Sequence, residues 1–310
     1  MSDSPVVAIV GPTATGKTAL AIALAAHFGG EVVNADSMQL YAGMDIGTAK
    51  PDLAERAGIA HHLIDVWPVT QLATVARYQI LAREVIDEIL GRGRLPIVVG
   101  GSGLYLRAAL DKLDFPGQSP EIRAALYAEL DELGPAVLHR RLTELDPAAA
   151  ATILPSNGRR IARALEVIEL TGRPYSASMP DYQSVYPTLH LGLDRADLDE
   201  RVERRVSHMM EAGLLDEVRS LLPAGLRGSP TAGKALGYAQ LLACLDDAGT
   251  VVGDLEVAVA ETVRTTRRFV RRQRSWFRRD PRIVWLDGAA SDLVALSQAA
   301  ITPTLEACTR

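Results

Sequence analysis

The sequence predicts an α/β protein in which a parallel sheet is flanked by helices and interrupted by an all-helical insertion. Short apolar runs rich in β-branched residues are typical of buried parallel strands, and they occur at residues 6–10, 31–35 and 95–99. A glycine-rich loop and a helical pattern follow the first run. Between residues 118 and 186 consecutive helix patterns replace the strands. We therefore expect a core domain at 1–117 and 187–310 and an insertion domain at 118–186.

The first strand leads into a phosphate-binding loop. Residues 11–18, GPTATGKT, fit the spacing G-x-x-x-x-G-K-S/T, and the alanine-rich segment after Lys17 predicts a helix to Phe28. Glycines let successive N–H groups face a phosphate, and the helix N-terminus adds positive charge. Lys17 would meet the terminal phosphate and the Thr18 hydroxyl would bind Mg²⁺. The motif predicts a P-loop NTPase-like sheet with a di- or triphosphate held by Gly11, Pro12, Thr13, Ala14, Thr15, Gly16, Lys17 and Thr18.

The second strand, Glu31–Ala35, is followed by Asp36. Because parallel strands end at one edge of the sheet, Asp36 is expected near Lys17 if the two strands are close neighbours. One interpretation makes Asp36 a Mg²⁺-linked carboxylate or a general base. The other makes it a helix N-cap, a position that Asp favours. The residue type alone leaves both open.

The third strand, Leu95–Val99, ends in Gly100-Gly101-Ser102-Gly103 without an acidic residue. An ordinary P-loop ATPase carries a Walker-B carboxylate at such a strand end. Its absence indicates that the loop does not serve hydrolysis of a nucleoside triphosphate.

The insertion shows helix patterns with proline at helix starts and glycine at helix ends. We expect them at Pro120–Leu133, Pro135–Leu145, Pro147–Leu154 and Gly158–Leu170. Arg159, Arg160 and Arg163 place basic charge on the last of these. A solvated helix face and an anion-binding face explain this charge equally well.

After the insertion, strands are expected at Thr188–Leu193 and Arg282–Leu286. A charged helix at Asp197–Ala212 carries Arg201 and Arg205 four residues apart, where like charges repel unless an anion lies between them. A further helix is expected to open at Gly233–Gln240.

The segment Glu261–Arg282 is strongly basic. It holds nine arginines, three aromatic residues and only two acids, Glu261 and Asp280. A solvated helix face normally mixes both signs of charge. Arginines interleaved with aromatic side chains suit RNA phosphates and unstacked bases, so this segment is a candidate RNA-binding surface.

Composition limits the other possibilities. The apolar share of 48% and the charged share of 23% are ordinary for a globular protein, and the net charge of −5 does not exclude a local basic surface. No apolar run is long enough to span a membrane, and residues 1–5 lack the basic start of a signal peptide. Two cysteines are too few for a disulfide framework. We therefore expect a cytoplasmic protein, without a membrane partner.

Several motifs together resemble those of the bacterial tRNA dimethylallyltransferases, also called tRNA isopentenyltransferases or the IPP transferase family. They are GPTATGKT (11–18), DSMQLY (36–41), GMDIGTAKP (43–51), HHLID (61–65), VGGSGLYL (99–106), RALEV (163–167) with TG (171–172), GYAQ (237–240) and TTRRFVRRQRSWF (265–277). The resemblance covers almost the whole chain in the same order. DSMQ beside this phosphate loop is its most specific part.

The resemblance implies transfer of a dimethylallyl group from dimethylallyl diphosphate to N6 of adenosine 37, beside the anticodon, in tRNAs that read codons beginning with U. The phosphate loop would hold the prenyl diphosphate instead of ATP. Asp36, Lys17, Thr18 and Arg205 would be catalytic, with Arg201 as the alternative to Arg205, and Mg²⁺ on Thr18 would be the cofactor. The enzyme is expected to be a monomer.

The resemblance also implies which residues hold the tRNA anticodon stem-loop. They are Asp36, Ser37, Met38, Gln39, Ser102, Arg123, Arg159, Arg160, Ile161, Ala162, Arg163, Lys234, Gly237, Tyr238, Arg271, Arg272, Gln273, Arg274, Ser275, Trp276, Phe277 and Arg278. Ser102 departs from the family, in which threonine is common at this position, but keeps the hydroxyl. The zinc finger of eukaryotic relatives has no counterpart here.

Two other functions were weighed. A small-molecule P-loop kinase would explain the first strand and loop, but it leaves the basic segment without a role. A non-catalytic RNA-binding protein would not need an intact Gly16-Lys17-Thr18 together with Asp36.

Overall fold

The computed structural model describes residues 4–178 and 182–308. The chain forms two compact units, Met1–Leu110 with Ser184–Arg310 and Asp111–Gln183. The insertion expected from the sequence was 118–186. Residues 1–3, at the polar N-terminus, and residues 179–181 of that expected insertion lie outside the described residues.

A six-stranded parallel sheet forms the centre of the larger unit, in the order β3-β2-β4-β1-β5-β6. The strands are β1 (Val6–Val10), β2 (Glu31–Asn34), β3 (His61–His62), β4 (Pro96–Gly100), β5 (Thr188–Asp194) and β6 (Ile283–Asp287). Every residue of β1, β2 and β4 is buried, which explains the continuous apolar character of β1 and β4; β2 also buries Glu31 and Asn34 at its ends. The predicted α/β class and its strands are confirmed, and the pair His61–His62 adds an edge strand.

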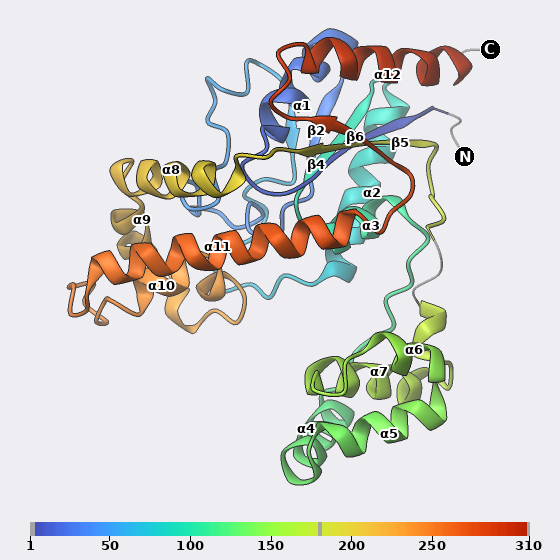
Figure 1. Ribbon diagram of the computed structural model, residues 1–310, viewed down its shortest axis with the longest axis vertical. Helices are drawn as coiled ribbons and strands as arrows, with labels where there is room; N and C mark the ends of the chain where they lie inside the picture. Colours follow the sequence, from blue (N-terminus) through green and yellow to red (C-terminus); the bar gives the residue numbers. More distant parts are fainter. Residues whose placement is uncertain (1–3, 179–181, 309–310) are drawn as a thin grey trace. The chain divides into compact units, whose positions relative to one another are not determined.

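Helices cover both faces of this sheet (Figure 1). α1 (Lys17–Phe28) and α12 (Leu293–Cys308) pack on one face, and α2 (Val75–Gly91) and α3 (Gly103–Leu110) pack on the other. One apolar core joins Ile9 of β1, Leu24 of α1 and Ile301 of α12, all fully buried. This packing holds the loop between β1 and α1 on a rigid support.

The strand order reverses between β1 and β4. After β1 the chain continues to β2 and β3 on one side, whereas after β4 it continues to β5 and β6 on the other side. Loops therefore diverge at the carboxyl ends of these two strands, which is where open α/β sheets bind ligands. The phosphate-loop motif and the Gly100–Gly103 turn both lie at this point.

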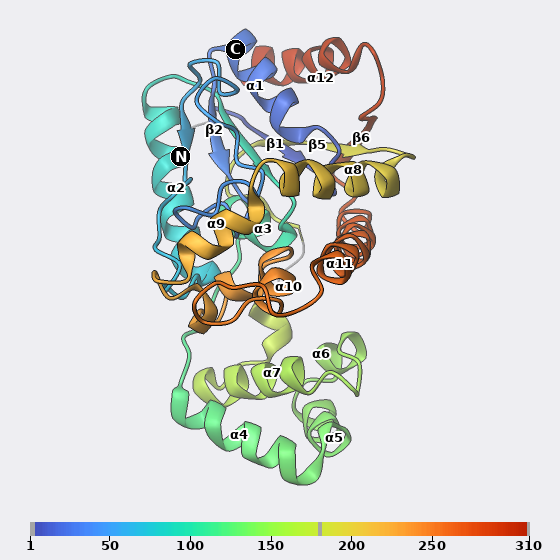
Figure 2. The same ribbon diagram turned by 90° about the vertical axis from the view of Figure 1, so that its left-hand side faces the viewer.

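Four further helices follow β5: α8 (Leu198–Glu211), α9 (Leu214–Leu221), α10 (Tyr238–Leu242) and α11 (Leu255–Phe277). α8 and α11 lie side by side, as both views show (Figures 1 and 2). A helix opens within Gly233–Gln240, as predicted, but only near the end of this segment. A short 3₁₀ turn at Ala232–Lys234 is followed by extended Ala235, and α10 begins only after Gly237, whose φ of 87° is left-handed.

The smaller unit is helical. It contains α4 (Pro120–Leu133), α5 (Pro135–Leu145), α6 (Pro147–Thr152), α7 (Gly158–Thr171) and a 3₁₀ turn at Tyr175–Ser178. Ser119, Asp146 and Asn157 cap α4, α6 and α7 through side-chain oxygens that accept backbone N–H groups. Leu126, Leu142 and Leu165 belong to its separate apolar core. All four helices expected here are confirmed.

Candidate active site

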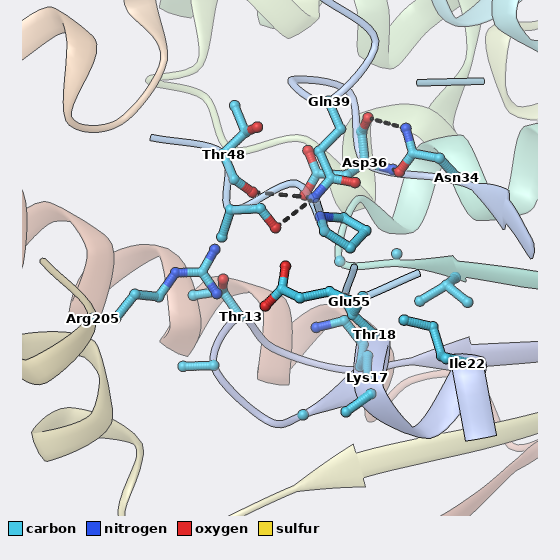
Figure 3. Close-up of a pocket in the computed structure, with 18 of the residues that line it drawn as sticks. Thr13, Lys17, Thr18, Ile22, Asn34, Asp36, Gln39, Thr48, Glu55 and Arg205 are labelled. Carbon is cyan, nitrogen blue, oxygen red and sulfur yellow. Dashed lines mark hydrogen bonds between the residues drawn. The ribbon is translucent and has the colours of Figure 1, made fainter. Parts of the chain in front are cut away.

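A pocket of about 850 Å³ lies at the carboxyl edge of the sheet (Figure 3). It brings together the phosphate loop, the segment after β2, the turn after β4 and one face of α8. Its lining includes Thr13, Ala14, Gly16, Lys17, Thr18, Asn34, Asp36, Gln39, Thr48, Ala49, Glu55, Gly100, Gly101, Arg201, Arg204, Arg205 and His208. Of the residues assigned to the diphosphate site, Thr13, Ala14, Gly16, Lys17 and Thr18 thus share one cavity, whereas Gly11, Pro12 and the fully buried Thr15 do not line it.

The phosphate loop depends on two glycines. Gly11 has a φ of 135°, and a Cβ there would lie 2.3 Å from the Leu193 carbonyl oxygen of β5. Gly16 has a φ of 98° and immediately precedes α1, so the first N–H groups of that helix open toward the pocket. Pro12 O accepts hydrogen bonds from Thr15 Oγ1 at 2.9 Å and from Lys17 Nζ at 2.5 Å. This geometry suits a bound phosphate group.

Lys17 is held in a partly desolvated, cationic environment. Burial, and after it the nearby Arg205 guanidinium, lower the pKa of Lys17 to about 7, and Asp36 opposes this shift. In the protein without a ligand, the ammonium group therefore loses its proton near neutral pH. A bound anion would favour the protonated form.

Two arginines of α8 reach this loop in different ways. Arg201 Nε donates to Ala14 O at 2.7 Å and so supports the loop backbone. Arg205 makes no hydrogen bond or ion pair within the described part of the chain, although it lines the pocket (Figure 3). Burial lowers the pKa of Arg205 from its usual range. Arg205 is therefore the one of this pair whose side chain has no protein partner among the described residues, whereas Arg201 is engaged through Nε.

Asp36 is fixed by the residues around it. Asn34 accepts the Asp36 N–H at 2.8 Å and donates to Asp36 O at 3.0 Å, and it also donates to Leu63 O. Asp36 Oδ1 accepts the Met38 N–H at 2.9 Å, so the carboxylate caps a turn, and no helix begins there. Its second oxygen has no hydrogen-bond donor in the described chain. One carboxylate thus combines a local capping role with a free acceptor in the pocket.

The remaining residues of the DSMQ segment connect to neighbouring loops. Ser102 Oγ lies 3.4 Å from both the backbone nitrogen and the Oγ of Ser37. Gln39 Nε2 donates to Thr48 O and Ala49 O at 3.1 and 3.3 Å. Gln39 lines the pocket with Asp36, whereas Ser37 and Ser102, which contact each other, are not among its lining residues.

The basic segment forms the second half of α11. Arg271, Arg272 and Ser275 are exposed, whereas Gln273 and Phe277 are buried. Arg274 and Arg278 contact the Asp194 carboxylate at 2.8 and 3.3 Å. Trp276 packs its indole against Gly103. The predicted contact residues of this helix therefore divide into free cations and residues already engaged within the protein.

Residues 234–238 divide in the same way. Lys234 is exposed and is a free cation within the described chain, while Gly237 and Tyr238 are buried within the protein. The Tyr238 hydroxyl donates to Glu217, which also accepts N–H groups from Asp45, Ile46 and Gly47. Burial, followed by the Glu217 charge, raises the pKa of Tyr238. Through Glu217, Tyr238 supports the backbone of residues 45–47 in the loop at 43–51.

In the smaller unit, Arg159 and Arg160 are exposed on α7, and Ile161 and Ala162 are buried. Arg123 and Arg163 both pair with buried Glu166, at 2.8 and 2.9 Å. These two ion pairs, together with burial that opposes them, leave the pKa of Glu166 below its usual range. One acid thus orients both arginines.

Sequence reasoning missed Asn34, Glu55 and Glu217. Asn34 ends β2 two residues before Asp36, so the sequence Asn-Ala-Asp at 34–36 was the available signal. Glu55 lines the pocket, and its Oε2 accepts the Asp52 N–H at 2.9 Å. Glu217 acts across 170 residues of sequence and has no local signature.

The described residues contain neither a candidate membrane span nor a candidate metal-ion cluster. No helix among them is long and apolar enough to cross a membrane. No cluster of three or more His, Cys, Asp or Glu side chains suited to a metal ion occurs among them either.

Comparison with known proteins gives consistent matches. The family model for IPP transferase matches residues 39–280. A tRNA dimethylallyltransferase of Streptomyces avermitilis is 59% identical over 307 residues, 97% of each chain, and one of Thermobifida fusca is 57% identical over 99% of this chain and 97% of its own.

Two solved structures of prenyl-transferring enzymes are similar to this chain over nearly its whole length. The tRNA isopentenylpyrophosphate transferase of Bacillus halodurans is 39% identical with a TM-score of 0.72, over 99% of this chain and 98% of its own. A eukaryotic dimethylallyltransferase captured acting on tRNA is 27% identical with a TM-score of 0.80, over 99% of this chain and 80% of its own. The chain described here belongs to the IPP transferase family.

Proposed function

We propose that the protein transfers a dimethylallyl group from dimethylallyl diphosphate to N6 of adenosine 37 in tRNAs that read codons beginning with U. The observation that carries the proposal is one pocket in which a phosphate loop, an unengaged arginine and a free carboxylate oxygen meet. The names of the relatives support tRNA as the acceptor. We propose that it acts as a monomer in the cytoplasm.

The donor end of the pocket is built for a leaving diphosphate. Loop N–H groups, Lys17 and Arg205 supply positive charge where the diphosphate would lie. As the prenyl carbon–oxygen bond breaks, negative charge grows on the diphosphate and cationic character grows on the allylic carbon. Preorganised donors stabilise such charge without reorganising at the moment of reaction.

Magnesium fits this donor set. The Thr18 hydroxyl lines the pocket beside Lys17, and a hydroxyl oxygen is a suitable ligand for a hard cation that keeps most of its other ligands as water and phosphate. We propose that Thr18 and the diphosphate oxygens hold Mg²⁺, which when bound supplies charge neutralisation to the leaving group.

The acceptor end contains Asp36. Adenine N6 is a weak nucleophile because its lone pair is delocalised into the ring. As the new nitrogen–carbon bond forms, N6 must lose a proton, and we propose that the Asp36 oxygen without a donor accepts it. Gln39 lines the same pocket, and we propose that it orients the base together with Ser37 and Ser102.

The base must leave the stack of the anticodon loop to reach a pocket at the edge of the sheet. We propose that the exposed cations of α11, above all Arg271 and Arg272, hold the phosphates of the stem-loop. We propose further RNA contacts for the exposed Lys234 and, in the smaller unit, for Arg159 and Arg160. A P-loop kinase is not favoured, because it gives this basic surface no role.

The test is a reaction without ATP. Purified protein, Mg²⁺, dimethylallyl diphosphate and unmodified tRNA are incubated, and the digested nucleosides are analysed by mass spectrometry. Dimethylallyl-adenosine is the expected product. Its absence, with phosphorylation of a small molecule or ATP hydrolysis once nucleotide is added, would refute the proposal.

A further inference from the structure

One face of α11 contacts the loops of the active site. Val270, Gln273 and Phe277 follow the spacing of a single helix face and are all buried. Val270 belongs to an apolar cluster with Leu198 and Val202 of α8, against which Ala14 of the phosphate loop packs. The exposed Arg271 and Arg272 lie on another face of the same turns. α11 therefore carries the proposed RNA surface on one face and packs toward the phosphate loop with another.

Gln273 makes the polar connection. Its Oε1 accepts the Thr13 N–H at 3.0 Å, and its Nε2 donates to Gly101 O at 2.9 Å. The side chain is only 5% exposed, so both ends of its amide are used inside the protein. A glycine is required opposite it, because a Cβ on Gly101 would lie 2.4 Å from Gln273 Nε2.

Gln273 and Lys17 hydrogen-bond to the same peptide unit, the one between Pro12 and Thr13. The Thr13 N–H and the Pro12 carbonyl belong to the same planar peptide unit. Gln273 accepts from the N–H side, and Lys17 Nζ donates to the carbonyl side at 2.5 Å. Any rotation of this peptide must move the acceptor of the Lys17 ammonium group.

The neighbouring turn is attached to the same helix. The Trp276 indole packs so closely on Gly103 that a Cβ there would lie 2.0 Å from its Nε1. Ser102, between the two glycines, contacts Ser37 of the DSMQ segment. Glycines at 101 and 103 therefore let α11 approach both the donor and the acceptor side of the pocket.

We propose that Gln273 is a positioning residue that couples RNA binding on α11 to diphosphate binding in the phosphate loop. This inference rests on the proposed function, since it needs both ligands. RNA held by Arg271 and Arg272 fixes α11, Gln273 then fixes the Pro12–Thr13 peptide, and the loop is held in the geometry that receives diphosphate. Coupling of this kind is reciprocal and amounts to about 5- to 150-fold in affinity.

The experiment measures this coupling directly on the full-length protein. The dissociation constant of Mg²⁺-pyrophosphate is determined by calorimetry with and without an unmodified anticodon stem-loop RNA. We expect the RNA to strengthen pyrophosphate binding by about fivefold or more in the wild type. Gln273→Met keeps the length and apolar packing of the side chain but removes both hydrogen bonds, and it should reduce this factor to less than about twofold.

Thr262→Val controls for damage to the helix, and Gly101→Ala perturbs the Gln273 contact independently. Thr262 is buried on α11 and donates only to Ala258 O, so Thr262→Val perturbs the same helix away from the loop and should keep the wild-type factor. Gly101→Ala attacks the Gln273 contact from the opposite side and should lose the factor as Gln273→Met does. Because the coupling is reciprocal, Gln273→Met should leave the affinity for the stem-loop alone within about twofold and should lower the gain in RNA affinity that pyrophosphate gives to less than about twofold.

The outcomes are separable. Wild-type coupling in both Gln273→Met and Gly101→Ala, or no coupling in a wild type that binds both ligands, overturns the positioning role and leaves the proposed function intact. A wild type that binds neither pyrophosphate nor the RNA refutes the proposed function and this inference with it.

Discussion

Arg271 and Arg272 should carry a salt-dependent share of RNA affinity that Arg274 does not. Both side chains are exposed, and neither pairs with an acid within the described chain, although the Arg272 guanidinium lies 5.6 Å from the centre of the Phe269 ring. Each phosphate contact contributes about −0.7 to −0.9 to the slope of log affinity against log salt. Replacing both arginines with alanine should therefore flatten the slope by about 1.4 to 1.8. Between about 50 and 200 mM salt the wild type would lose about tenfold more affinity than the variant.

Arg274→Ala is the control on the same helix because it also removes an arginine, one charge compared with two in the double variant. Arg274 is already paired with Asp194 at 2.8 Å, so its loss should change the slope by less than about 0.5. Fluorescence anisotropy of a labelled anticodon stem-loop at several salt concentrations gives all three slopes. An unchanged slope in the Arg271/Arg272 variant, or an equal change in Arg274→Ala, would refute the assignment of this face.

Three further predictions concern the pocket. Asp36→Asn should lower transfer by about 10²- to 10⁴-fold while stem-loop affinity stays within about twofold, and an unaffected rate would remove Asp36 from proton transfer. Because the Lys17 pKa of about 7 must rise when an anion binds, pyrophosphate binding should take up a proton above pH 7 and weaken with rising pH. Calorimetry near pH 8 in two buffers of different ionisation enthalpy measures that proton; equal heats would contradict it. Arg205→Ala should weaken pyrophosphate binding by about ten- to hundredfold. Arg201→Ala should weaken it less, since Arg201 is engaged with Ala14 O.

Local sequence signals were sufficient for the strands and for most helices. β1 and β4 are buried on both faces, so their apolar runs had a single interpretation, and the glycine spacing of residues 11–18 defined the loop between β1 and α1. The insertion helices were predictable because proline starts and side-chain caps are local features. Near α10 the local pattern located the helix but not its first residue, since Gly237 adopts φ 87° and the Gln240 side chain accepts the Gly237 N–H, so the helix starts only at Tyr238.

Contacts between distant segments were beyond the reach of sequence patterns. Thr13 and Gln273 are separated by 260 residues, and an arginine-rich segment gives no sign that its one glutamine points inward. The residue pattern of 271–278 predicted a uniform RNA surface, whereas Asp194 engages two of its arginines. α12 was also missed, because Pro303 within it is normally a helix breaker.

The close approach of β2 and β4 connects the missing Walker-B acid to the position of Asp36. β4 lies next to β1, with Gly100 opposite Val10, which is where a P-loop kinase would place its metal-binding carboxylate. A Cβ on Gly100 would lie 2.3 Å from the Ala35 carbonyl oxygen, so no side chain fits there unless the chain after β2 moves. That same chain, fixed by the Ala35 N–H to Val99 O bond at 2.7 Å and by Asn34, presents Asp36 to the pocket one residue later. The close contact of Ala35 with β4 that leaves no room for an acid at Gly100 thus also presents Asp36 to the pocket, where we propose that it accepts the proton of the incoming amine.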